Sequence, residues 1–227
     1  MQRTVRSIAT GIRRYIQRND LLNTIFHIGY RLINYASLVL IFEVAVLSAE
    51  DADWVLAADW SGCWDFLSYD QLRFFGRSDP SLFLDDKFLD QAFARGDRCY
   101  AYVEDGTLGA YTWYSTNPTP LQDGLVATFH PDYIYMYKVF TVPAFRGRRL
   151  CGIGVTRAFQ ALMREGMHKG LVCYIEVHNQ PSLKALRRIG FKLVGTGIVF
   201  GMTCPYISYS SAGCRGIFRA EVTSRPS

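Results

Sequence analysis

The feature that most constrains the fold is a strand that stops at a proline and is followed by a helix. Residues 133–142, YIYMYKVFTV, have the aromatic and β-branched composition of a strand, and Pro143 ends it. Residues 154–167 then place Ala158 and Leu162 on one face of a predicted helix. A helix N-terminus presents free backbone N–H groups and the positive end of the helix dipole, so the turn between the two elements is suited to an anion.

The turn itself is rich in glycine and arginine. Gly147 and Gly152 lack a Cβ and let a ligand approach the backbone closely. Arg146, Arg148 and Arg149 carry planar guanidinium groups that match phosphate oxygens. A basic turn before a helix is equally typical of a solvated surface, so this motif alone leaves both interpretations open.

A second motif follows in the next strand. Residues 171–177, LVCYIEV, are apolar except for Glu176 and predict a buried strand. Residues 181–189 predict a short helix that Gly190 ends. With a hairpin before them and strands after them, these elements indicate one α/β or α+β domain with a mixed sheet.

Together the two motifs resemble the GNAT superfamily of N-acetyltransferases. In that family a strand ending in V-x-P runs into R/Q-x-x-G-x-G/A, whose amides hold the diphosphate of acetyl-CoA. The next strand leads to N-x-x-[A/S] and a helix that closes on G-F. The resemblance spans about residues 38–200, and the matching positions are Val142, Pro143, Arg146, Gly147, Asn179, Ser182, Gly190 and Phe191.

The resemblance implies a fold, a donor and a donor site. The fold is α+β in three layers, with a mixed, mostly antiparallel sheet flanked by helices and an extra N-terminal amphipathic helix. The donor is acetyl-CoA or another acyl-CoA, with no metal. The backbone of Phe140, Thr141 and Val142 would hold the thioester. The remaining donor contacts would come from Arg146, Gly147, Arg148, Arg149, Leu150, Cys151, Gly152, Asn179 and Ser182.

The sequence departs from the family pattern at two places. Counted from Arg146, the two glycine positions fall on Arg149 and Cys151, although a count that starts at Arg149 is met by glycines further on. The Val-Pro anchor favours the first count. The tyrosine that many members place seven residues after the asparagine, and that protonates the leaving thiolate, is Leu186 here.

Acyl transfer to an amine requires removal of a proton, because a primary amine has a pKa of about 10.4. Glu176 is the first candidate base, since an apolar strand would shield it from water, and a paired structural carboxylate is an equal alternative. Tyr137 is a second candidate, with packing as its alternative role. His130 and Asp132 lie in or beside the predicted long loop and are within reach of a substrate, although the polarity of a surface loop explains them equally well.

The other predicted elements have local signals. Residues 98–115 predict a hairpin that turns at Asp105-Gly106. Residues 38–47 predict a buried strand, and Ser48 predicts the N-cap of a helix through residues 54–60. A short helix is expected at 85–94, a long loop at 115–131 and two strands after residue 191, whereas 61–80 give no clear pattern.

Residues 1–36 are predicted to form a basic helical extension of the GNAT-like domain at 37–227. Val5, Ile8 and Ile12 have helical spacing, and the segment holds six arginines. Three interpretations stay open: the helix packs on the sheet, forms a homodimer contact, or lies on an anionic membrane. Because its arginines interrupt every apolar run, the segment is not expected to be a signal peptide, and the six cysteines show no metal-ligand spacing. We therefore expect reduced thiols and a cytoplasmic location.

The charge distribution indicates two kinds of partner. Residues 37–135 hold sixteen acidic and five basic residues, whereas residues 136–227 hold three and fourteen. The basic half suits the anionic donor and the acidic half suits a cationic amine acceptor of small size. No nucleic acid is expected, because the basic residues coincide with the donor motif. The predicted function is an N-acyltransferase, and the alternative is an acyl-CoA-binding module with reduced catalysis.

Overall fold

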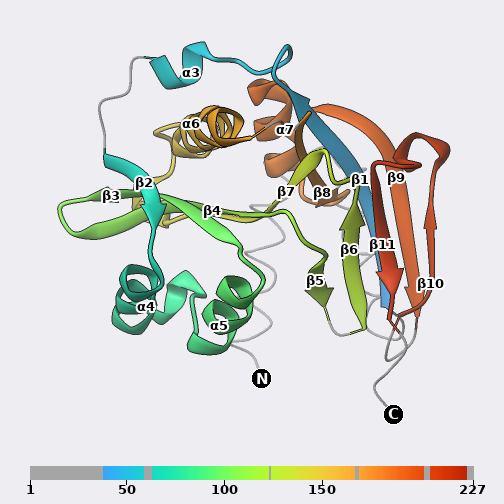
Figure 1. Cartoon of the computed structure of the whole chain (residues 1–227), viewed down its shortest axis with the longest axis horizontal. Coiled ribbons are helices and arrows are strands. Elements are labelled where there is room, and N and C mark those ends of the chain that lie inside the picture. Colours follow the sequence, from blue (N-terminus) through green and yellow to red (C-terminus); the bar gives the residue numbers. More distant parts are fainter. Residues whose placement is uncertain (1–37, 59–62, 123, 167–168, 202–204, 224–227) are drawn as a thin grey trace, which may run out of the picture.

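The computed structural model describes residues 38–58, 63–122, 124–166, 169–201 and 205–223. The helix expected at the N-terminus, with its boundary at residue 36, lies outside the described residues. An eight-stranded sheet forms the middle of three layers, with helices on one face and helices plus a three-stranded sheet on the other (Figure 1). The predicted α+β fold with a helix-flanked sheet is therefore confirmed.

The large sheet is mixed and mostly antiparallel. Its strands follow the order β10-β9-β1-β8-β7-β4-β3-β2, and only β7 and β8 are parallel. The strands are β1 (Leu38–Ser48), β2 (Cys63–Leu67), β3 (Arg98–Glu104), β4 (Thr107–Ser115), β7 (Tyr133–Thr141), β8 (Gly170–Glu176), β9 (Lys192–Gly201) and β10 (Pro205–Ser210).

Strand β1 lies between β8 and β9, which follow one another in the chain. Phe42 and Val44 are fully buried on one of its faces, and Ala45 and Leu47 on the other. A strand covered on both faces has a continuous apolar sequence, which is why the run from residue 38 was recognisable. The predicted strand is confirmed, and it places the start of the described chain inside the sheet.

One face of the sheet carries α6 (Leu150–Glu165), α7 (Gln180–Ile189) and the short α3 (Val55–Ala58) (Figure 1). Both long helices bury an apolar stripe at three- and four-residue spacing. In α6 the stripe includes Val155 and Phe159, both fully buried. The predicted helix at 181–189 is confirmed almost to its ends.

The opposite face carries α4 (Tyr69–Ser78) and α5 (Asp86–Ala94) over β3 and β4. Helix α4 begins with a capping box, in which Ser68 and Gln71 each accept a hydrogen bond from the other's backbone N–H. Asp85 caps α5 by accepting from the N–H of Phe88 at 2.9 Å. The predicted α5 is confirmed, and the segment that gave no clear pattern contains β2 and α4.

A second sheet covers the rest of that face. It has the order β11-β6-β5, from β5 (Thr119–Gln122), β6 (Leu125–Phe129) and β11 (Phe218–Val222). Leu125 and Ala127 alternate along β6 and pack toward the large sheet. The prediction of a long loop at 115–131 is therefore wrong. About half of this segment forms the strands β5 and β6, and their inward-facing residues are buried.

Two helix starts differ from the predictions. Ser48 ends β1 and donates a hydrogen bond to Asp51 Oδ2 at 2.7 Å. The helix that follows, α3, begins only at Val55 and is described as far as Ala58, since residues 59–62 lie outside the described ranges. Helix α6 begins at Leu150, four residues before the predicted start. Leu150 is buried against Tyr102 and Ala110, so packing outweighs the low helix propensity of the glycines that follow.

The β3–β4 hairpin is confirmed at the predicted turn. Asp105 and Gly106 both adopt left-handed φ values, 50° and 72°. Two such residues form the turn that matches the twist of a two-stranded ribbon.

Candidate functional site

Strands β7 and β8 pair for only three residues and then diverge. Residues 133–135 pair in parallel with residues 170–172. Beyond them β7 continues along β4 as far as Thr141, and β8 continues along β1 as far as Glu176. We call the two facing edges, residues 136–141 and 173–176, the wedge. Backbone groups on these edges are not paired across the wedge.

A β-bulge in β7 accounts for the divergence. Lys138 and Val139 together lie opposite the single residue Thr112 of β4, and Lys138 has a left-handed φ of 47°. An extra residue on one strand bends it away from its neighbour. The ammonium of Lys138 lies 3.5 Å from the centre of the Phe88 ring, and burial lowers the pKa of this lysine. The sequence has no glycine here and gave no signal for the bulge.

The turn after β7 leads directly into the N-terminus of α6. A 3-10 turn, Pro143–Phe145, is followed by Gly147 and Arg149, which have φ values of 84° and 61°. The first α6 hydrogen bond joins the N–H of Ile153 to the carbonyl of Arg149 at 3.1 Å. Three N–H groups precede this bond and have no helical acceptor, those of Leu150, Cys151 and Gly152. The positive end of α6 is thus free for an anion.

The structure shows which residues occupy the two glycine positions of the family pattern and where Gly152 and Gly154 lie. Arg149 is the N-cap of α6 and Cys151 lies in its first turn, so side chains occupy the two positions where the family pattern has glycine. Gly152 and Gly154 lie within the helix. A Cβ on Gly154 would lie 2.4 Å from a ring carbon of Trp64. Gly154 therefore serves close packing of α6 against β2, not the turn.

The three arginines of the turn have different partners. Arg146 Nε donates to the carbonyl of Thr141 at 3.2 Å. Arg148 donates two hydrogen bonds to the carboxylate of Glu104, at 2.7 and 2.8 Å, and these lower the pKa of Glu104 to about 2. Arg149 is exposed, with no ion pair to any residue that the structure describes. The charge of Arg148 is compensated by Glu104, whereas that of Arg149 faces solvent.

The residues expected to hold the thioester lie at the wedge. Phe140 and Thr141 end β7 beyond the bulge. The N–H of Val142 donates to the carbonyl of Gly109 at 2.9 Å, so this group already has a partner. Phe140, two residues earlier and opposite Tyr111, directs its backbone groups to the same neighbouring strand, so Thr141 is the residue of the three whose backbone faces the wedge.

Cys151 has the properties of a structural thiol. Its side chain is half-buried, and burial raises its pKa to about 11. The thiolate is the nucleophilic form of cysteine, so a thiol that stays protonated at neutral pH is a poor nucleophile. Its backbone N–H, in the first turn of α6, is the group it offers to an anion.

The second motif caps α7. Asn179 is the N-cap, and its side-chain oxygen accepts from the N–H of Ser182 at 3.3 Å. Leu186 is buried in the core below α6 and α7 and places no hydroxyl at the wedge. Gly190 ends the helix with a φ of 110°, and a Cβ there would lie 1.9 Å from the carbonyl oxygen of Asp51.

Glu176 lies at the end of β8, on the wedge. Its side chain is 38% exposed, and Oε2 lies 3.1 Å from Nδ1 of His178. The expectation that the strand would shield this carboxylate from water is therefore wrong, because β8 emerges from the core at its last residue. Glu176 opposes Phe42 on β1 and so points to the face that carries the second sheet.

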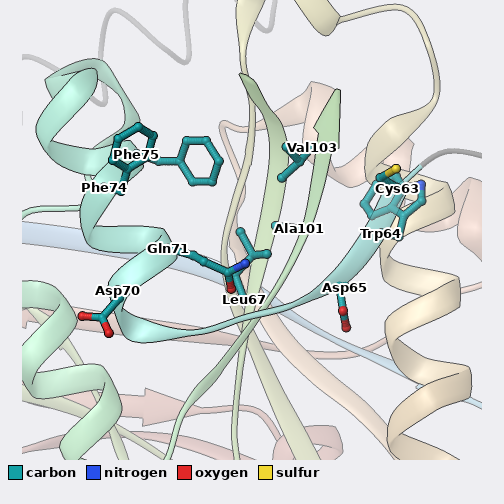
Figure 2. A pocket seen from close by; sticks show the side chains of 10 residues that line it. All are labelled: Cys63, Trp64, Asp65, Leu67, Asp70, Gln71, Phe74, Phe75, Ala101 and Val103. Carbon is teal, nitrogen blue, oxygen red and sulfur yellow. The ribbon is translucent and has the colours of Figure 1, made fainter. Parts of the chain in front are cut away.

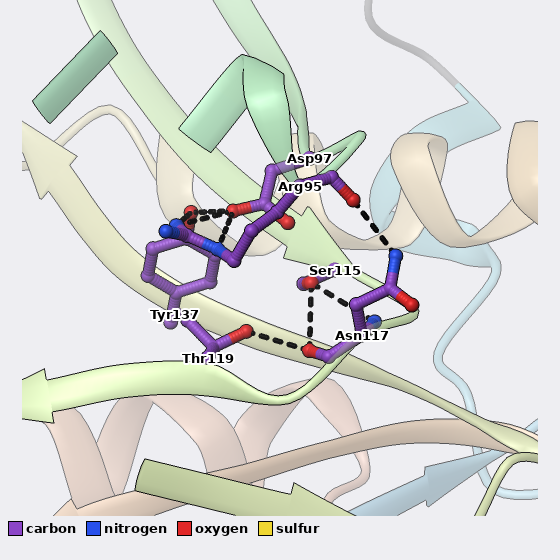
Figure 3. Close-up of polar contacts among 6 residues, drawn as sticks. All are labelled: Arg95, Asp97, Ser115, Asn117, Thr119 and Tyr137. Carbon is purple, nitrogen blue, oxygen red and sulfur yellow. Dashed lines mark hydrogen bonds and ion pairs between the residues drawn. The ribbon is translucent and has the colours of Figure 1, made fainter. Parts of the chain in front are cut away.

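Tyr137 points to the same face from the other edge of the wedge, since it packs with the clusters on that face. Its hydroxyl donates to Asp97 Oδ2 at 2.6 Å, and Arg95 donates to the same oxygen at 2.7 Å (Figure 3). Arg95 is held in turn by Asn117, whose amide donates to its carbonyl at 2.7 Å. Burial and the bond to Asp97 raise the pKa of Tyr137, so the phenol stays protonated.

Asp97 is a site residue that the sequence did not indicate. Its side chain is completely buried, and its second oxygen, Oδ1, has no hydrogen-bond partner among the described residues. Its partner Tyr137 is 40 residues further along the chain, so no local pattern could have joined them. A buried carboxylate with one open oxygen holds Tyr137 by a charge-assisted hydrogen bond.

His130 and Asp132 are not part of the wedge. The N–H of Asp132 donates to Nδ1 of His130 at 3.2 Å, and Lys169 forms an ion pair with Asp132. Both residues precede β7, whereas the wedge opens at its far end. Their candidacy as substrate contacts is therefore not supported.

A cavity of about 670 Å³ lies elsewhere, between α4 and the β2–β3 edge of the sheet (Figure 2). Phe74, Phe75 and Val103 give it apolar walls, and Asp65 and Asp70 lie at its sides. β2 is the third strand from β7, so this cavity is separate from the wedge. Within the described ranges no group of three potential metal ligands occurs, and no helix is long and apolar enough to cross a membrane.

The chain is thus an α+β protein in which a diverging pair of strands lies beside the N-terminus of a helix. Residues 64–191 match the family model described as Acetyltransferase (GNAT) family. Because the match covers more than half of the chain, the chain belongs to the GNAT acetyltransferase family. A search of curated proteins found no match.

Solved structures share the fold at low sequence identity. A Drosophila protein is 19% identical, with a TM-score of 0.51 over 74% of this chain and 52% of its own. A tandem GNAT protein from the clavulanic acid biosynthesis pathway, solved without acetyl-CoA, is 16% identical, with a TM-score of 0.50 over 85% of this chain and 56% of its own. The matched part thus spans about half the length of each of these proteins.

Proposed function

We propose that this protein transfers an acyl group from acyl-CoA to the amine of a small molecule by direct attack. The observation that carries the proposal is the wedge lying beside the free N-terminus of α6. A ligand that combines a diphosphate with an extended thioester arm fits such a site, because the helix end binds the anion and the strand edge pairs with amides of the arm.

The proposed contacts to acyl-CoA come from hydrogen-bonding and charged groups at the start of α6 that have no acceptor or ion pair among the described residues. The N–H groups of Leu150, Cys151 and Gly152 and the exposed guanidinium of Arg149 face the diphosphate. Arg146 acts differently, since it holds the carbonyl of Thr141 and so fixes the end of β7.

Glu176 is the proposed base. It lies at the wedge and is accessible to a substrate, and His178 at 3.1 Å can share the proton. Tyr137, on the opposite edge and facing the same way, is the proposed positioning group, because Asp97 holds its ring and hydroxyl. The ammonium of the acceptor loses one proton to Glu176, and the free amine attacks the thioester carbonyl. The tetrahedral intermediate expels CoA as the thiolate, and the nitrogen releases its second proton to the thiolate or to water, which leaves the neutral amide.

The acceptor is proposed to be a cationic amine. The support is the acidic excess of residues 37–135, which include α4 and α5 on the face to which Glu176 and Tyr137 point. Part of that charge has a structural use, since Asp79 and Asp85 cap helices and Asp86 pairs with Arg73. The electrostatic attraction of a cationic amine is therefore attributed to the carboxylates of residues 37–135 that have no such structural use.

A second candidate is an acyl-CoA-binding module with reduced catalysis. Buried Leu186, which provides no acid for the leaving thiolate, favours it. A thiol with a pKa of about 8.5 leaves largely without protonation, so this loss lowers turnover less than the loss of a base.

The test is release of free CoA from acetyl-CoA and longer acyl-CoA donors in the presence of a panel of amines, followed by mass spectrometry. We expect amine-dependent release, and a rate about 10²–10⁴ lower for Glu176→Gln at unchanged CoA affinity. Glu221→Gln, a change of the same kind at an exposed position of β11 in the second sheet, is the matched control. Tight CoA binding without release for any amine would select the binding module.

A further inference from the structure

An apolar patch lies on β9 and β10, exposed on the described part of the chain. It consists of Ile198, Phe200, Ile207 and Tyr209, whose exposed fractions are 41%, 50%, 65% and 66%. The register places Ile207 opposite Phe200 and Tyr209 opposite Ile198, so the four side chains form two cross-strand pairs on one face. Contiguous exposed apolar side chains of this size mark an interaction surface.

The patch lies on the same face of the sheet as α6 and α7, and neither helix packs on it. Val199, between two patch residues, is fully buried toward the second sheet, so its neighbours point the other way. Val39 and Ile41 of β1 lie opposite Phe200 and Ile198 and extend the patch to a third strand. The patch is thus three strands wide, about 10 Å, which is the width of one helix.

The N-terminal residues that lie outside the described ranges, 1–37, join the described chain at this patch. Leu38, the first residue of β1, pairs with Gly201 at the end of β9. The 37 residues before it include Leu22, Ile25 and Phe26, which recur at helical spacing. The five residues 33–37 reach up to about 17 Å when extended, enough to return a helix across all three strands. A tether this short gives an effective concentration of about a millimolar or more.

We propose that residues 21–32 pack on this patch as an amphipathic helix of the same chain. The apolar side chains of the segment cover the patch, and its one arginine, Arg31, stays in solvent. Both apolar surfaces are thereby removed from water. The segment then completes the helical layer on that face of the sheet. This docking is independent of acyl transfer at the wedge.

The test is photo-crosslinking in the full-length protein with Phe200→p-benzoylphenylalanine. We expect crosslinks to residues 21–32 in a species with the mass of one chain. Phe74→p-benzoylphenylalanine, at an aromatic side chain that is 65% exposed at the other end of the sheet, is the control and is not expected to crosslink to that segment. Crosslinks to a second copy, crosslinks only to added anionic lipid vesicles, or no crosslink would overturn the proposal.

A second pair of variants, both outside the patch, tests the contact without a further change at Phe200. In the crosslinking background, Phe26→Asp places a charge on the apolar stripe and is expected to reduce the crosslink at least tenfold. Asn23→Asp adds the same charge off the stripe and is expected to leave the yield unchanged. Equal yields in the two variants would refute packing through the apolar face.

Discussion

Replacement of Arg149 by glycine should raise stability and lower CoA affinity in the same protein. Arg149 has a φ of 61°, a conformation that costs a residue with a Cβ about 1–2 kcal/mol. Glycine removes that cost, but it also makes the unfolded chain more flexible, which lowers the free energy of unfolding by about 0.5–1 kcal/mol. The net expectation is a gain of about 0.5–1 kcal/mol in the free energy of unfolding.

The affinity should move in the opposite direction. A hydrogen bond to a charged group contributes about 1.5–3 kcal/mol, and each 1.4 kcal/mol is a factor of ten in Kd. Because Arg149 is exposed and solvent screens its charge, we take the lower end, a loss of about tenfold.

The assay combines calorimetry with CoA and urea unfolding of the wild type, Arg149→Gly and Arg149→Ala. The alanine variant keeps the backbone cost and loses the charge, so it should lose affinity without gaining stability. A glycine variant that binds CoA as tightly as the wild type would refute the role of Arg149 in binding phosphate.

Three further predictions concern the surroundings of the site. Tyr137→Phe should lower the free energy of unfolding by about 1.5–3 kcal/mol in urea, because a buried carboxylate loses a donor, and an unchanged midpoint would contradict this. Gly154→Ala should destabilise by about 1–3 kcal/mol, since its Cβ meets a tryptophan ring at 2.4 Å, whereas Gly152→Ala, with its nearest contact at 3.4 Å, should change thermal stability little. The pKa of Glu104 is depressed to about 2 in the folded protein, so its pair with Arg148 stabilises above the unfolded value of about 4.3 and is lost as the pH falls toward 2. Glu104→Gln should therefore be less stable than the wild type at pH 7 and equal to it near pH 2, and a constant difference would count against the pair.

The elements with local signals could be predicted from the sequence. The turn at Asp105-Gly106, the end of β7 at Pro143 and the end of α7 at Gly190 each depend on backbone preferences of one or two residues. The two motifs also predicted the donor site in the turn from β7 to α6, which in the structure adjoins one edge of the wedge, and ligand binding there stays a prediction.

The parts that could not be predicted depend on contacts between distant residues. The bulge at Lys138 arises from pairing with β4 and has no glycine to mark it. Arg148 and Glu104 are 44 residues apart, and their ion pair removes one of the three arginines expected to meet phosphate. The exposure of Glu176 likewise follows from where the sheet ends, not from the apolar residues before it.

The most direct test of the central claim is an NMR titration of the amide-labelled protein with CoA, with adenosine as the control without phosphate. The account predicts that the largest shifts occur at the N–H groups of Leu150, Cys151 and Gly152, with a smaller shift at Thr141, and that adenosine reproduces none of the first set. Shifts confined to the cavity between α4 and β2, or the same shifts with adenosine, would contradict it.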